Sequence, residues 1–153
     1  MVHALSEIHR VLVPGGILID LRPILDRWQV EVASARETRM TGRVQDFENG
    51  LDDDAAANRS VSEAEQKQWF VRENEDFFPY VYSWDTATEM EEWLEEEWND
   101  FIALDEKAKK STRSAWALGD GDSRVRLRMK MLVTRWRRGK KGEVIYSRKR
   151  KAP

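Results

Sequence analysis

Residues 11–21 read Val-Leu-Val-Pro-Gly-Gly-Ile-Leu-Ile-Asp-Leu, and this stretch decides the fold. Before it, the apolar residues Ala4, Leu5 and Ile8 recur at the spacing of an amphipathic helix. Pro-Gly-Gly then ends that helix, because proline cannot continue it and glycine adopts the backbone angles of a tight turn. The apolar run from 17 to 21 is short enough for a buried strand. The sequence therefore predicts a helix, a turn and a strand in that order.

The composition favours one folded domain. A chain of 153 residues is long enough for one core, so we expect a single domain over 1–153. Charged residues make up 35% and hydrophobic ones 41%, which excludes wholesale disorder. The absence of cysteine excludes disulfides and thiolate metal sites. The longest apolar run, 11–21, is shorter than the roughly 20 residues of a membrane span, so a cytoplasmic protein is expected.

The middle of the chain contains weaker signals. Pro23 is expected to end the first strand, because proline cannot donate to a sheet ladder. Alternating residues over 28–47 indicate a loose hairpin, and 49–59 reads as a surface loop. Ser62 opens a Ser-x-x-Glu capping box, which predicts a helix that carries Trp69 and Phe70.

The second half of the chain has clearer patterns. Aromatic residues alternate over 78–84 and predict a strand. Thr86 opens a second capping box, and apolar residues at helical spacing extend from Met90 to Ile102. Another helix is expected over 105–117, a turn over 119–122 and a long strand over 124–136, with a short return strand at 144–146.

The segment Ala4-Leu5-Ser6-Glu7-Ile8-His9-Arg10-Val11-Leu12-Val13-Pro14-Gly15-Gly16 resembles the middle of a class I S-adenosylmethionine-dependent methyltransferase. In that family the helix follows the fourth strand of the sheet and leads through Pro-Gly-Gly into the fifth. The resemblance implies that 78–84 is the sixth strand. It also implies that 124–136 is the seventh, inserted antiparallel between the fifth and sixth. The expected fold class is α/β: the C-terminal half of a methyltransferase, a partial Rossmann-like fold with helices packed on a small mixed sheet.

The resemblance does not extend to the cofactor-binding half of the family. There, a glycine-rich turn after the first strand approaches the cofactor, and an acidic residue after the second binds the ribose. Gly119-Asp120-Gly121 follows a helix instead of a strand, so it reads as a solvent turn. The isolated chain is therefore expected to bind no S-adenosylmethionine and to be inactive, unless an N-terminal half completes it. Asp20 and Arg22 end the fifth strand, on the edge that faces the acceptor in the family, and are substrate-edge candidates without a catalytic role.

Other candidate sites are structural by sequence. His3 and His9 are six positions apart and do not share one helix face, so no metal site is expected, and His9 reads as a surface or core-edge residue. Four glutamates at 91, 92, 95 and 96 read as a solvated helix face or as a face opposite the basic final strand. That basic side must meet solvent, acid or phosphate, and its candidate polyanion contacts are Arg124, Arg126, Arg128 and Lys130.

Three functions stay open. The first is a non-catalytic interaction or dimerisation module, because strand 17–21 lacks a neighbour and its edge invites pairing with a second copy, unless the insertion beginning at Ile24 covers it. The second is a fragment of an active S-adenosylmethionine-dependent methyltransferase whose N-terminal half is missing, through a misplaced start codon or because a separate gene encodes it. The third is a nucleic-acid-binding protein that uses the basic strand and the basic tail at 139–153. A homodimer is favoured, nucleic acid is not, and no membrane partner is expected.

Overall fold

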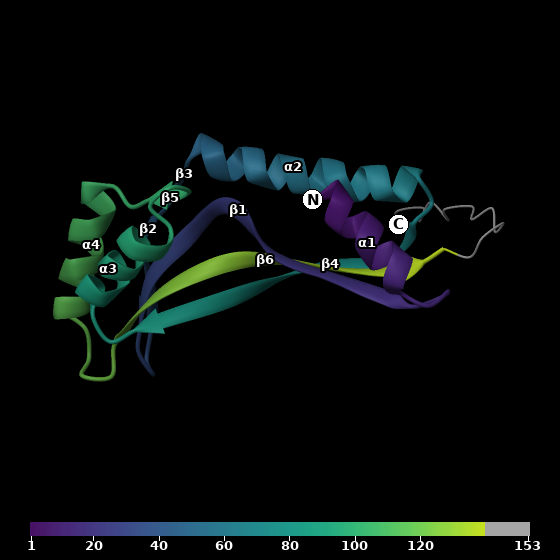
Figure 1. The fold of residues 1–153 in the computed structure, drawn as a ribbon. Coiled ribbons are helices and arrows are strands. Elements are labelled where there is room, and N and C mark those ends of the chain that lie inside the picture. The colour runs from purple at the N-terminus through teal and green to yellow at the C-terminus, as the bar shows by residue number, and fades with distance from the viewer. Residues whose placement is uncertain (140–153) are drawn as a thin grey trace, which may run out of the picture.

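The computed structural model describes residues 1–139, drawn as a coloured ribbon in Figure 1. In this part of the chain four helices accompany a four-stranded sheet and a small two-stranded one. The helices are α1 (Val2–Val11), α2 (Glu48–Gln66), α3 (Ala87–Glu97) and α4 (Glu106–Ala117). The strands are β1 (Ile17–Ala33), β2 (Thr38–Arg43), β3 (Gln45–Asp46), β4 (Phe70–Trp84), β5 (Ile102–Ala103) and β6 (Arg124–Arg138). The predicted return strand at 144–146 and the basic tail from residue 140 onward lie outside the described residues.

The main sheet has the strand order β2-β1-β6-β4. The final strand, β6, lies between β1 and β4 and is antiparallel to both, which is the position that the resemblance implied for it. The prediction of a mixed sheet is wrong, because every neighbouring pair is antiparallel. The strands that run in the same direction, β1 and β4, are separated by β6 and never pair.

The two ends of the sheet are covered on opposite faces. Near the start of β6, the odd-numbered Val125, Leu127 and Met129 pack in a cluster with residues of α3 and α4. Near its end, the even-numbered Thr134 and Trp136 are buried, and Trp136 packs with residues of α1 and α2. Since side chains alternate along a strand, these clusters lie on different faces. Figure 1 shows the same division, with α1 and α2 over one half of the sheet and α3 and α4 at the other end.

The larger cluster confirms the clearest sequence signals. The Thr86 hydroxyl accepts a hydrogen bond from the backbone N–H of Glu89 at 3.1 Å, so α3 begins at the predicted cap. Met90 and Leu94 then bury their side chains against β1 and β6. The helix ends at Glu97, earlier than predicted, because Ile102 joins the short strand β5 and pairs with Asp46 of β3.

Strand β1 continues through Pro23, so the prediction that proline ends the ladder is wrong. Pro23 pairs with Met131 and Ile24 with Lys130, and pairing resumes at Gln29 after an arch in β1. Proline is tolerated here because β2 pairs only with residues 29–33, which leaves Pro23 on a segment with a neighbour on one side alone.

The predicted loop at 49–59 is also wrong, because these residues form the first half of α2. Its buried positions are small residues, Gly50, Ala57, Ser60 and Ala64, which carry little hydrophobic signal but allow close packing. The helix therefore begins well before Ser62, whose capping-box pattern is coincidental. It also ends before Trp69, and Phe70 starts β4.

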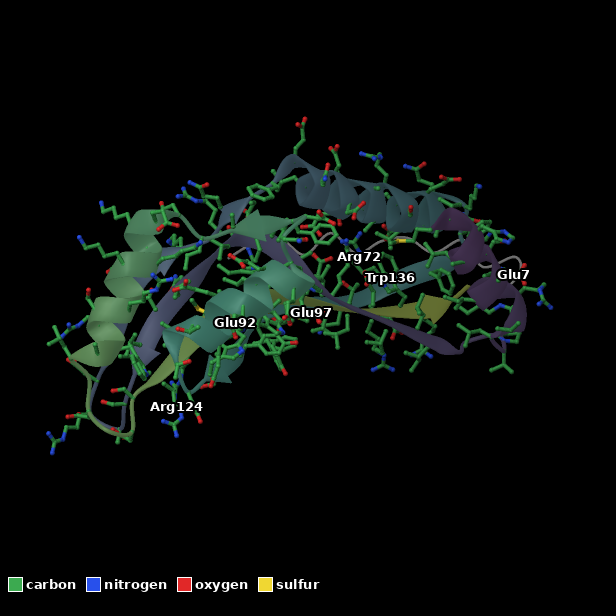
Figure 2. All side chains as sticks on the ribbon, turned by 60° about the vertical axis from the view of Figure 1, so that its left-hand side comes forward. Glu7, Arg72, Glu92, Glu97, Arg124 and Trp136 are labelled. Atoms are coloured by element: carbon green, nitrogen blue, oxygen red, sulfur yellow. The ribbon has the colours of Figure 1, made fainter. Side chains whose placement is uncertain are left out.

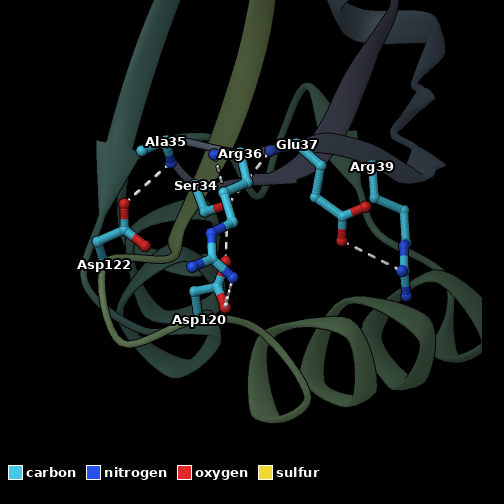
Figure 3. Close-up of polar contacts among 7 residues, drawn as sticks. All are labelled: Ser34, Ala35, Arg36, Glu37, Arg39, Asp120 and Asp122. Carbon is cyan, nitrogen blue, oxygen red and sulfur yellow. Dashed lines mark hydrogen bonds and ion pairs between the residues drawn. The ribbon is translucent and has the colours of Figure 1, made fainter.

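The Gly-Asp-Gly-Asp turn before β6 forms a hydrogen bond and an ion pair with the turn between β1 and β2 (Figure 3). Asp122 accepts a hydrogen bond from the backbone N–H of Ala35 at 2.9 Å, and Asp120 forms an ion pair with Arg36 at 3.8 Å. Within the β1–β2 turn, the Ser34 hydroxyl accepts a hydrogen bond from the backbone N–H of Arg36. These contacts join the α4–β6 connection to the β1–β2 hairpin.

Candidate functional site

Asp20 and Arg22 lie together on β1, on the face covered by α2. Arg22 Nε is 3.4 Å from Asp20 Oδ2, and Arg22 Nη2 donates to the side-chain oxygen of Asn58 on α2 at 2.6 Å. Both side chains are largely buried. The predicted substrate-edge pair is therefore brought together, but its two charges face each other beneath a helix. This geometry joins α2 to the sheet and leaves no free charge to orient an acceptor substrate.

The basic side of β6 meets acids. Three of its four cations form ion pairs, which are Arg124 with Asp85 at 2.8 Å, Arg128 with Glu31 at 3.0 Å and Lys130 with Asp26 at 2.8 Å. Within residues 1–139 Arg126 has no ion pair. These side chains were expected to meet solvent, acid or phosphate, and three of the four pair with carboxylates. Because the carboxylates already neutralise three of the charges, this surface offers a phosphate backbone little net attraction.

The arch in β1 opens a pocket beside these ion pairs. It has a volume of about 260 Å³ and lies between the arch and strand β4, with Phe77, Arg128 and Lys130 among its walls. Arg27 in the arch adopts a left-handed backbone (φ 49°), and its N–H donates a hydrogen bond to the Asp46 side chain at 3.0 Å, which helps to hold the arch in place. Lys130 lies over the Phe77 ring, 5.0 Å from its centroid. Arg128 and Lys130 are paired with carboxylates, and Arg43 donates to the backbone oxygen of Arg27 at 3.1 Å, so each of these cations is already engaged by a protein group.

The glutamates of α3 do not oppose β6. Glu91 is buried and forms a two-pronged ion pair with Arg113 of α4, with Arg113 Nε donating to Oε1 at 2.9 Å. This hydrogen bond raises the pKa of Arg113 above its usual value. Glu92 and Glu97 extend away from the sheet in Figure 2. The carboxylates of α3 thus serve helix packing and solvation, as the alternative of a solvated face predicted.

The remaining candidate is the edge of β1 between Ile17 and Ile24. β6 borders this segment on one side, and within residues 1–139 no strand pairs with its other side. The backbone oxygen of Gly16 accepts a hydrogen bond from Arg138 at 2.8 Å, so the Gly16 carbonyl points toward β6. In an antiparallel ladder, peptide groups alternate between the two sides of a strand. The even positions 18, 20 and 22 therefore bond to β6, and the odd positions point to the free edge.

The same odd positions have exposed side chains. Ile17, Ile19 and Leu21 are 43%, 53% and 57% exposed, because α3 and α4 cover this face only at the far end of the sheet. Pro23 is the next odd position, and its missing N–H thus falls on the free side. A row of three apolar residues has both its peptide groups and its side chains unpartnered, which is the geometry that accepts a further strand.

A pocket opens at this edge beneath α1. It has a volume of about 230 Å³ and is lined mainly by apolar side chains, including Leu5, Ile8, Leu18 and Phe70. Trp136 also lines it; the indole N–H of this buried residue has no hydrogen-bond partner in residues 1–139. Arg72 lies over the Trp136 ring, with its guanidinium carbon 4.9 Å from the centroid (Figure 2). Packing at this end of the sheet is less complete than around α3 and α4.

Sequence reasoning missed two features of this edge. It identified the edge of strand 17–21 but took Pro23 to end the strand. It therefore missed that the strand continues through Pro23, and that Pro23 ends only the row of free N–H donors. It also missed Trp136 as a polar group of the pocket. The alternation of Ile17, Ile19 and Leu21 around Leu18 and Asp20 was the available signal that one side of the strand would be exposed.

Other kinds of site are not found in the described part of the chain. Over residues 1–139 no three His, Cys, Asp or Glu side chains lie close enough to hold a metal ion. None of the helices there is long and apolar enough to cross a membrane.

Comparison with known proteins adds no relative from which a function could be carried over. No protein-family model matches the chain, and the searches of curated proteins and of solved structures find no match to it either.

Proposed function

We propose that this chain is a methyltransferase-like half-sheet that acts by associating with another polypeptide through the free edge of β1, and that the isolated chain is not catalytic. One observation carries the proposal. Ile17, Ile19 and Leu21 expose both their peptide groups and their side chains, on a strand that has a single neighbour over this segment within residues 1–139. An edge of this kind pairs readily with another strand.

The strand order supports the methyltransferase-like part of the proposal. An amphipathic helix leads through Pro-Gly-Gly into β1, and β6 lies between β1 and β4, antiparallel to both. Helices α1 and α2 lie over one half of the sheet (Figure 1). The order of these three strands is the one that the resemblance implied for the C-terminal half of a partial Rossmann-like sheet, whereas the first half of α2 was expected to be a loop.

The side chains present do not fit S-adenosylmethionine. The Gly-Asp-Gly-Asp turn follows helix α4 and precedes strand β6, and it engages the β1–β2 turn through Asp120 and Asp122, so it lacks the strand-turn-helix setting of a cofactor-binding glycine turn. Asp20 is paired with Arg22 beneath α2, so its charge is already engaged within the protein. Titration calorimetry of the isolated chain with S-adenosylmethionine should show no binding. Stoichiometric micromolar binding would overturn the non-catalytic part of the proposal and favour a working methyltransferase.

The association is tested by removing one N–H from the free edge. In Ile19→Pro the lost N–H points away from β6, so the ladder with β6 stays intact and only the free side loses a donor. Sedimentation equilibrium should show a concentration-dependent association of the wild-type chain, weakened about tenfold or more by the substitution. The circular dichroism of Ile19→Pro should remain that of the wild type, because Pro23 occupies an equivalent position in the same strand.

Leu18→Pro is the matched control. Position 18 points its N–H toward β6, so proline there removes a ladder hydrogen bond and should destabilise the fold itself. If the wild-type chain is monomeric at all accessible concentrations and binds no added strand, the proposed association is wrong.

A further inference from the structure

We infer that the partner at the β1 edge is a second copy of this chain, paired antiparallel about a two-fold axis that passes through Ile19. This inference rests on the proposed function, since it names the occupant of the same edge. It is carried by the pattern of free peptide groups, which is short, bounded on both sides and symmetric about one residue.

The free groups are limited on each side. Pro23 has no N–H, so the donors of the edge end at Leu21. On the other side, the tight turn before the strand begins at Gly16, whose N–H bonds to the oxygen of Val13 at 2.8 Å, and Gly15 adopts a φ of 78°. Between these limits, the free N–H donors of the edge strand belong to residues 17, 19 and 21.

A two-fold axis at Ile19 gives the free peptide groups of residues 17, 19 and 21 hydrogen-bond partners in the second copy. Ile19 then faces Ile19 of the second copy, and Ile17 faces Leu21, so that each residue exchanges two hydrogen bonds with its opposite. A register centred on Leu21 would place Pro23 opposite Ile19 and leave the Ile19 oxygen without a donor. The pairing is isologous, as expected for a dimer that closes on itself.

The side chains agree with this register. The three exposed apolar residues of each copy lie on one face of the joined sheet and form Ile–Ile and Ile–Leu pairs, which stabilise neighbouring strands. On the other face, Leu18 lies opposite Asp20 of the second copy. Because Asp20 is already paired with Arg22 in its own chain, the dimer does not bring unpaired negative charges together.

The size of the interface sets the expected strength. A shared segment from 17 to 21 is about 17 Å long. Strand pairing over this length buries less than the roughly 1,200–2,000 Å² of a standard stable interface. A formal net charge of -2 adds little repulsion between copies. The dimer should therefore form in a concentration-dependent manner instead of being permanent.

Cysteine cross-linking tests the register, because the chain contains no cysteine of its own. In Ile19→Cys the two thiols would lie on directly opposite residues with Cα atoms about 5.5 Å apart, within the range of a disulfide. In Leu21→Cys the two thiols would be about 14 Å apart, too far to join. Mild oxidation should convert Ile19→Cys to a covalent dimer and leave Leu21→Cys and the exposed control Val13→Cys monomeric on a denaturing gel.

A mixture of two variants adds a second readout. Ile17→Cys and Leu21→Cys should each fail to cross-link alone, yet form a mixed disulfide dimer when combined. If Ile19→Cys, Leu21→Cys and Val13→Cys cross-link equally while the wild-type chain still dimerises, the register is wrong and the proposed association stands. A monomeric wild-type chain by sedimentation would overturn both.

Discussion

The two ends of the four-stranded sheet differ in how completely their strands are surrounded. At the end near α3 and α4, β1 has neighbours on both sides, and Val30 is fully buried with its partner Leu127. At the other end β1 has one neighbour, its odd positions are exposed, and the buried indole of Trp136 lacks a hydrogen-bond partner in residues 1–139. The same strand is therefore a central strand over 29–33 and an edge strand over 17–24.

This contrast indicates which end of the sheet stabilises the fold and which end is free to associate with a partner. The α3 and α4 end contains the larger buried cluster, so it is expected to supply most of the hydrophobic stabilisation. The α1 and α2 end has a smaller cluster of four buried residues, and these include Leu5, Phe70 and Trp136. The less complete end carries the surface that is free to bind a partner. Substitutions that affect one end should thus separate folding from association.

The largest expected effect is at Leu127. Leu127→Ala empties a fully buried position between β1 and β4 and should lower the free energy of unfolding by about 2–5 kcal/mol. Leu18→Ala, at a half-buried position under α1, should cost roughly half as much. Urea denaturation followed by circular dichroism measures both values. A larger loss for Leu18→Ala than for Leu127→Ala would reverse the comparison of the two ends.

A smaller effect is expected at the ion pair of Arg128 and Glu31. The Glu31 side chain is only 5% exposed, so Arg128→Met leaves a buried carboxylate without its charged partner. The loss should be about 1–3 kcal/mol in the free energy of unfolding, because hydrogen bonds to a charged group are being removed. Arg126→Met is the matched control on the same face of β6, and it should change the stability by less than about 0.5 kcal/mol. Similar losses for both variants would show that Glu31 does not depend on Arg128.

Strong local patterns predicted the elements in the second half of the chain. The Thr86 cap, the helix over 105–117 and the strand from Arg124 onward are all found, because each depends on residues close together in sequence. The buried side of β6 was predicted from Val125 to Met129, since strict alternation of apolar and basic residues fixes which side is buried, but nearer the end of the strand Thr134 and Trp136 on the opposite side are buried.

The first half was harder because tertiary contacts decide its structure. Helix α2 buries alanine, glycine and serine, whose small side chains give no apolar period, so 49–59 read as a loop. Pro23 stays in β1 because its N–H side faces an edge, which depends on where β2 pairs. No local pattern specifies that pairing.

The candidate site was predicted in part. The open edge of strand 17–21 followed from the apolar run at the start of the chain, whereas the ion pair of Asp20 with Arg22 beneath α2 did not. The contact with Asn58 joins residues 36 positions apart, in a helix that the sequence did not predict. Only the packing of α2 on β1 converts two substrate-edge candidates into a structural pair.

The smallest expected effect is a pH dependence confined to the α1 end. The His9 ring lies 6.0 Å from Trp69 and 5.8 Å from Phe70, and burial, with a contribution from the positive charge of Arg138, lowers its pKa from 6.5. Above pH 6.5 His9 is neutral in both the folded and unfolded states and has no effect. As the pH falls below 6.5 the unfolded chain binds the proton first, so stability decreases until the folded pKa is passed. His9→Phe should remove this loss of stability between pH 7 and 5, while the exposed control His3→Gln should retain it. Urea denaturation at the two pH values measures the difference, and an unchanged slope in His9→Phe would assign the pH dependence to other groups.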